Sequence, residues 1–154
     1  MSRRDQIKMS EDEVQAFLAQ ERVMVVASNG RDGWPHLMPM WYVLRDGDLW
    51  AWTYARSQKA RNFERDDRVT LQVEAGDSDY GQLRGVMIKA RVVLLADVEA
   101  VTELGMQIFD RYTGGAGEEV RAMVRKQAEK RVGMRFVRQE IATWDHRKLA
   151  AGVY

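Results

Sequence analysis

The chain has no cysteine. This absence excludes disulfide bonds, thiolate metal ligands and a cysteine nucleophile. Proline is also scarce, at two of 154 residues, and no proline- or serine-rich stretch marks a linker between domains. A chain of this length without a linker is predicted to form a single domain over residues 1–154.

Long apolar runs are absent as well. No stretch approaches the roughly 18 apolar residues of a membrane-spanning helix, and Met1–Gln6 has no apolar signal-peptide core. The formal net charge of only +1 gives no overall attraction to nucleic acid. With 45% hydrophobic and 31% charged residues, the composition is typical of a globular protein. We therefore expect a cytoplasmic enzyme or binding protein that associates with neither nucleic acid nor membranes.

Helix caps and turn residues divide the chain into short elements. Ser10 and Glu13 form a capping box that predicts a helix over residues 11–20. Asn-Gly and Asp-Gly pairs between the first apolar runs favour tight turns, so these strands are expected to be antiparallel. Strands are predicted at about 22–28, 34–44, 48–52, 68–74, 82–95 and 134–144, and further helices at about 57–66, 97–112 and 118–131. Residues 82–95 fit either one long bent strand or two strands.

These elements predict an α+β fold, mainly β with helices, in which about six strands follow one another as an antiparallel meander. Closing the meander into a barrel would remove its unpaired strand edges. The barrel is expected to comprise about residues 22–95 and 134–144.

The segment from Trp52 to Asn62 combines hydroxyls and cations at the expected start of a helix. Thr53 and Ser57 supply the hydroxyls, and the nearby cations are Arg56, Lys59 and Arg61. Free backbone N–H groups and the positive end of the helix dipole make such a junction an anion site, and phosphate is the obvious ligand. The alternative is that Ser57 only caps the helix and that the cations are solvated.

A second basic segment lies between Arg121 and Arg138. It holds seven cations against one acid, Glu129, and some of the cations are four residues apart, so that they would align along helix faces. The simplest interpretation is a solvated face. The functional alternative is a rim that attracts an anionic ligand.

Four segments, in order, resemble the pyridoxamine 5′-phosphate oxidase-like split β-barrel flavoproteins. Residues 33–42, Gly-Trp-Pro-His-Leu-Met-Pro-Met-Trp-Tyr, resemble their second strand; residues 50–53, 57–62 and 66–69 resemble their phosphate-binding strand, turn and helix. The resemblance is good over residues 11–95 and looser to Trp144. The Ser-Gln-Lys-Ala sequence at 57–60 is similar to the branch that uses the deazaflavin coenzyme F420. The resemblance implies a six-stranded antiparallel split β-barrel.

The resemblance also implies where a cofactor binds. The positions matching a phosphate site are Thr53, Ser57, Gln58 and Lys59, with Arg61 and Asn62 one turn further on. The positions matching the wall beside the tricyclic ring are Met38, Pro39, Met40 and Trp41, with Trp52 on the next strand, and Trp144 matches a position that dimers present to the partner's cofactor. Packing in the core is the alternative for these methionines and tryptophans. His36 and His146 are too far apart to suggest a metal pair, and neither is assigned a role.

Two departures from the family pattern narrow the activity. The C-terminal Arg and His signature of true pyridoxamine phosphate oxidases is missing from Trp144–Leu149, so vitamin B6 oxidation is not expected. Gly85 stands where those oxidases carry a glutamine that contacts the ring, which favours a different cofactor or a more open ring pocket.

We therefore expect a homodimer with cofactor sites at the subunit interface. It would bind coenzyme F420, with FMN as the alternative, and transfer a hydride between the cofactor and a small organic substrate. The basic segment at 121–138 could then hold the polyanionic tail of F420. No catalytic residue is predicted. The alternatives are an FMN-binding flavin reductase or stress flavoprotein of the same fold, and a non-enzymatic barrel that sequesters an apolar ligand such as a fatty acid or haem.

Overall fold

The computed structural model describes residues 2–115 and 117–149. The strands are β1 (Met24–Asn29), β2 (Pro35–Met40), β3 (Val43–Arg45), β4 (Asp48–Tyr54), β5 (Arg68–Ala75), β6 (Arg84–Leu95) and β7 (Arg131–Asp145). The helices are α1 (Arg3–Gln6), α2 (Glu11–Gln20), α3 (Gln58–Arg65), α4 (Val98–Thr113) and α5 (Glu118–Ala128), with short 3-10 turns η1 (Tyr80–Gln82) and η2 (His146–Lys148). The predicted domain also includes residues 1, 116 and 150–154, which lie outside the described part.

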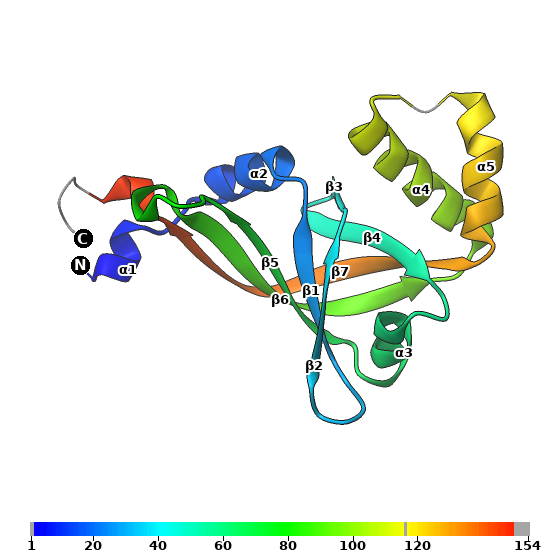
Figure 1. Cartoon of the computed structure of the whole chain (residues 1–154), viewed down its shortest axis with the longest axis horizontal. Helices are drawn as coiled ribbons and strands as arrows, with labels where there is room; N and C mark the ends of the chain where they lie inside the picture. Colours follow the sequence, from blue (N-terminus) through cyan, green and yellow to red (C-terminus); the bar gives the residue numbers. More distant parts are fainter. Residues whose placement is uncertain (1, 116, 150–154) are drawn as a thin grey trace.

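All strands of the described residues belong to one antiparallel sheet with the order β2-β1-β5-β6-β7-β4-β3. β2 and β3 are therefore at opposite edges, although only Trp41 and Tyr42 separate them in the chain. The predicted meander, in which each strand pairs with the next, is wrong for the first five strands, because β1 pairs with β5 and β4 pairs with β7. The short link between β2 and β3 requires the sheet to curl until its two edges approach each other. The result is the predicted α+β fold, a curled antiparallel half-barrel with helices (Figure 1).

The sheet has seven strands rather than the predicted six. The strand predicted over 34–44 is divided, because the chain leaves one sheet edge after Met40 and joins the other at Val43. At the break, the Tyr42 N–H donates to the Tyr112 hydroxyl at 3.0 Å instead of to a neighbouring strand. The apolar pattern continues across the break and therefore hides it.

Tyr42 fixes this link from inside the fold. Its side chain is fully buried, and its hydroxyl lies 2.7 Å from the carbonyl oxygen of Leu18 and 2.9 Å from that of Glu21. The guanidinium of Arg111 lies 4.5 Å from the centre of the Tyr42 ring. Burial raises the pKa of Tyr42 to about 12, so the hydroxyl stays protonated and remains a donor.

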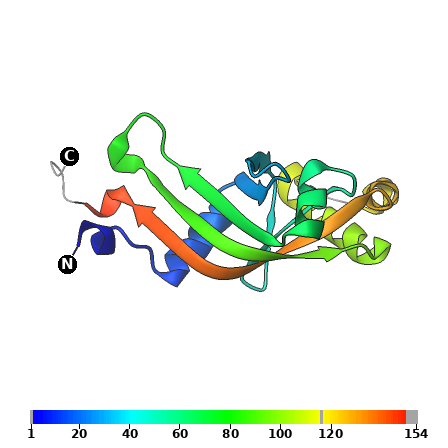
Figure 2. The same cartoon turned by 90° about the horizontal axis from the view of Figure 1, so that it is seen from below.

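The stretch predicted as one or two strands is a single long strand, β6. It pairs with β5 on one side and with β7 on the other, and the pairing with β7 shifts register between Lys89 and Ala90. Figure 2 shows β6 and β7 bending together along the length of the molecule. Alternate β6 side chains, Val86, Ile88, Ala90 and Val92, are buried in the main core.

Helix α4 covers the face of β4 that points away from the main core, and α5 packs against α4 and β7. A second apolar cluster forms there from Val43, Trp50, Leu104 and Ile108. The predicted cap is present, since the Asp97 carboxylate accepts from the Ala100 N–H at 2.9 Å. The helix predicted over 118–131 ends at Ala128, because residues from Arg131 onward pair with β4 and extend β7. Among the described residues, no helix is long and apolar enough to cross a membrane.

Candidate functional site

The start of α3 gathers the hydroxyls and the lysine singled out in the sequence. Ser57 is the N-cap residue, and its Oγ accepts from the Ala60 N–H at 3.3 Å. The Thr53 hydroxyl, at the end of β4, donates to Ser57 Oγ at 3.2 Å, and Lys59 Nζ donates to Thr53 Oγ1 at 3.2 Å. Cation, hydroxyls and free helix N–H groups therefore converge on one point, as an anion site requires.

Lys59 distinguishes an anion site from a simple helix cap. Its side chain is half-buried, and no ion pair with an acid is found for it within the described residues. Burial lowers the pKa of its ammonium group below the ordinary value, because the charged form loses hydration. A bound anion would offset this cost. A cap with solvated cations would leave Lys59 in water, which is not its position.

The first two turns of α3 are tied to β1 by amides. Gln58 Nε2 donates to Asn62 Oδ1 at 2.9 Å, and Asn62 Nδ2 donates to Ser28 Oγ at 2.9 Å. Asn62 is completely buried, so its bonds within the chain hold the helix in place. Arg61, which immediately precedes Asn62, is exposed. The sequence prediction grouped Arg61 and Asn62 as ligand residues, but the structure gives them different surroundings.

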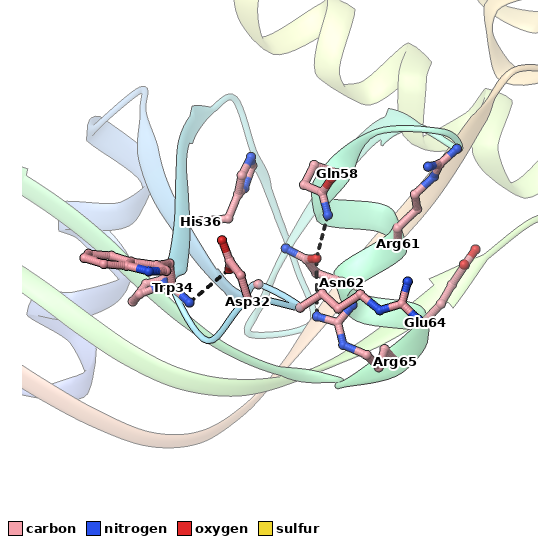
Figure 3. A pocket seen from close by; sticks show the side chains of 11 residues that line it. Asp32, Trp34, His36, Gln58, Arg61, Asn62, Glu64 and Arg65 are labelled. Atoms are coloured by element: carbon pink, nitrogen blue, oxygen red, sulfur yellow. Dashed lines mark hydrogen bonds between the residues drawn. The ribbon is translucent and has the colours of Figure 1, made fainter.

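An open cleft of about 880 Å³ lies between the β1–β2 turn and α3. It is lined by six residues between Gly30 and His36 and by five residues of α3: Gln58, Arg61, Asn62, Glu64 and Arg65. In Figure 3, His36 stands on the hairpin side and Gln58 on the helix side, with the mouth of the cleft between them. His36, to which no role was assigned from the sequence, lines this cleft together with Asn62, which is 26 residues away in the chain.

The predicted wall, Met38 to Trp41, occupies the end of β2 and the link that follows it. β2 is an edge strand, where a proline such as Pro39 is tolerated because only one side of the strand is hydrogen-bonded to a neighbouring strand. Met38 is 41% exposed and Trp41 is 53% exposed, and the Trp41 ring stacks on Tyr112 at 4.4 Å between centroids. Met40 is partly buried against the main core. The wall is thus open to solvent in the single chain.

Two predicted tryptophans lie away from this group within one chain. Trp52 points to the face of β4 opposite Thr53, where an added Cβ on Gly105 of α4 would lie 2.6 Å from its ring. The guanidinium of Arg131 lies 4.4 Å from the centroid of the Trp52 ring. Trp144 lies at the far end of β7, and an added Cβ on Gly85 would come within 2.4 Å of its ring. The space left by Gly85 is therefore filled by Trp144.

The second basic segment is not a continuous positive rim. It is divided between α5 and β7, and four of its arginines pair with acids: Arg121 with Glu99 and Glu103, Arg125 with Glu99, Arg135 with Asp48, and Arg138 with Glu11. These acids come from other parts of the chain, which is why the local sequence did not reveal them. Within the described residues, no cluster of side chains suited to a metal ion is found either.

Comparison with known proteins places this fold. A sequence profile described as pyridoxamine 5′-phosphate oxidase matches residues 10–148. The chain belongs to this family. A search of curated proteins found no match.

Several solved structures are similar to this chain. The conserved hypothetical protein Rv2991 from Mycobacterium tuberculosis is 39% identical, with a TM-score of 0.89, over 99% of this chain and 98% of that one. An F420 reductase is 20% identical, with a TM-score of 0.67, over 82% and 94% of the two chains. The haem storage protein HutZ from Vibrio cholerae is 15% identical, with a TM-score of 0.67, over 85% and 92%. The last two likenesses concern the fold alone.

Proposed function

We propose that this chain binds the phosphate group of a flavin-type cofactor at the start of α3. The observation that carries the proposal is Lys59, a half-buried cation that has no acidic partner in the described chain and lies beside two hydroxyls at a helix N-terminus. Family membership supports a flavin-type cofactor over another phosphate ligand. Coenzyme F420 is the favoured cofactor and FMN the alternative.

The hydrogen bonds around Ser57 explain how the residues would hold a phosphate. Lys59 donates to Thr53, and Thr53 donates to Ser57, whose oxygen also accepts from the Ala60 N–H. Since Ser57 Oγ is used as an acceptor, its own proton is left to donate to a phosphate oxygen. Lys59 would also bind the phosphate directly. In addition, its charge would strengthen the hydrogen bond from Ser57 to the phosphate, because a charged donor polarises the chain of hydrogen bonds that follows it.

The exposed wall from Met38 to Trp41 would receive the ring of the cofactor. Bound there, the cofactor supplies hydride transfer to a small organic substrate, while the protein orients it and excludes water. A single chain leaves both Met38 and Trp41 open to solvent. We propose that a second copy of the chain covers the site, so that Trp144 of one copy approaches the cofactor of the other.

The preference for F420 has a further support in the charges near the site. F420 carries carboxylates beyond its phosphate, whereas FMN ends at the phosphate. The cleft along α3 contains Arg31, Arg61 and Arg65 against two acids, Asp32 and Glu64. This cleft, rather than the paired arginines of residues 121–138, is therefore proposed to hold the acidic tail.

Titration of the apo protein with F420 and with FMN, followed by fluorescence, tests the proposal. We expect tight binding of F420 and weaker binding of FMN. The reverse order would select the FMN alternative, and binding of neither would overturn the proposed function. The Lys59→Ala variant tests the alternative of a barrel that sequesters an apolar ligand. Such a ligand makes no phosphate contact and would still bind to this variant, whereas a phosphate-bearing cofactor would bind more weakly.

A further inference from the structure

We propose that His36 is a further binding residue for the cofactor phosphate, supplied by β2 from the side opposite α3. This inference rests on the proposed function and adds a ligand contact to it. It concerns a residue that lies outside the Thr53–Asn62 segment in which the phosphate contacts were sought.

The pairing of β1 and β2 places His36 on the α3 face of the hairpin. His36 lies directly opposite Ser28 in the antiparallel register, and directly paired residues point to the same face of a sheet. Ser28 in turn accepts a hydrogen bond from Asn62 of α3, and Asn62 accepts one from Gln58 at the helix start. His36 therefore lies on the same face of the hairpin as Ser28, and Figure 3 shows it across the cleft from Gln58, the first residue of α3.

One ring nitrogen of His36 lacks a partner. Its Nδ1 atom is buried, and no hydrogen-bond partner for it is found within the described residues. Buried polar atoms are nearly always hydrogen-bonded, so an unpartnered one at a cleft marks a position where a ligand group would complete the bond. The ring lines the cleft of about 880 Å³ and is not sealed inside the core.

The rest of β2 offers a phosphate no other side-chain donor. Pro35 and Pro39 have no N–H group, and the side chains of Leu37, Met38 and Met40 are apolar. The donors at the start of α3, which are Ser57, Lys59 and the free helix N–H groups, would all approach the phosphate from one side. Within β2, His36 is the residue whose side chain can donate to the remaining oxygens.

Affinities for paired ligands with and without phosphate test this role. The ligands are FMN and riboflavin, and F420 and its phosphate-free deazaflavin, each titrated into wild type and His36→Ala by fluorescence. We expect His36→Ala to weaken the phosphate-bearing ligand by about tenfold or more, the range of a hydrogen bond to a charged group, and to change the phosphate-free ligand by less than about twofold. Equal effects within each pair, or no effect at all, would overturn the inference.

Two substitutions and one control sharpen the result. His36→Asn places an amide donor near the Nδ1 position and is expected to restore part of the lost affinity, whereas His36→Gln reaches toward the Nε2 position and is expected to restore less. Glu119→Gln, an exposed change on α5 outside this cleft, should leave the affinities for all four ligands unchanged. If wild type binds neither F420 nor FMN, the proposed function itself fails; if wild type binds and His36→Ala is unchanged, only the role of His36 fails.

Discussion

Residues 56–61 and residues 121–138 are both rich in arginine and lysine, yet their cations have different surroundings. In the first segment, Lys59 is half-buried beside hydroxyls and has no acidic partner in the described chain. In the second, Glu99 alone pairs with both Arg121 and Arg125, at 2.6 and 2.5 Å. A run of cations is therefore a candidate anion site only where the fold leaves its charge uncompensated and removes it from water.

Removing Lys59 should give the largest difference between the two segments. We expect Lys59→Met to weaken binding of the phosphate-bearing cofactor by about 10- to 100-fold, because it removes a charged donor from the site. Arg125→Ala, the matched change in the second segment, should alter the affinity by less than about twofold, since Arg125 is committed to Glu99. The dissociation constants from cofactor fluorescence measure both effects, and similar losses in the two variants would end the distinction.

Freeing the arginines of the second segment should have a smaller effect. Glu99→Gln removes the acid shared by Arg121 and Arg125 and makes α5 more like an uncompensated basic surface. We expect a loss of less than about 1 kcal/mol in the free energy of unfolding, because these ion pairs are exposed. Cofactor affinity should stay the same. A clear gain in F420 affinity would instead return the acidic tail to the 121–138 segment.

The pH dependence of Lys59 should give the smallest effect. Its pKa in the folded apo protein is lowered by burial, so in the window between that pKa and the ordinary lysine value the folded state binds fewer protons than the unfolded state. Below this window, the folded state carries the full cost of burying the charged ammonium group. As the pH rises through the window, this group loses its proton in the folded state and the free energy of unfolding increases.

The comparison of wild type with Lys59→Met isolates this contribution from other alkaline titrations. Denaturant unfolding from neutral to alkaline pH should show wild type gaining stability relative to the variant as the pH rises. A difference between wild type and variant that does not change with pH would show that Lys59 is solvated rather than half-buried.

Local signals predicted the helix starts of this protein well. The Ser10 capping box, the Ser57 cap and the Asp97 cap all form with a backbone N–H three residues ahead, so a few neighbouring residues decide them. Trp52 shows where the local reading was incomplete. It adjoins Thr53 in a strand, and adjacent strand residues point to opposite faces, so the alternation itself separates Trp52 from the phosphate group.

The break at Trp41 and Tyr42 could not be predicted in this way. The apolar pattern runs through residues 34–44 without interruption, and the break depends on Arg111 and Tyr112, about 70 residues later. The same holds for His36, whose place in the cleft depends on α3 being held against β1 through Asn62. Contacts between segments distant in the chain leave no periodicity in either segment.

The sequence by itself determined most of the helices and strands, the antiparallel direction of the strands, and the cap, hydroxyls and lysine at the start of α3, because each depends on residues close together in the chain. Only the tertiary structure decided which cations stay uncompensated, which face each tryptophan occupies and that His36 stands opposite the helix start. These features depend on burial and on partners brought from distant segments. Charge and aromatic content can be counted along a chain, but their solvation and counter-charges arise only when the sheet curls and its edges meet.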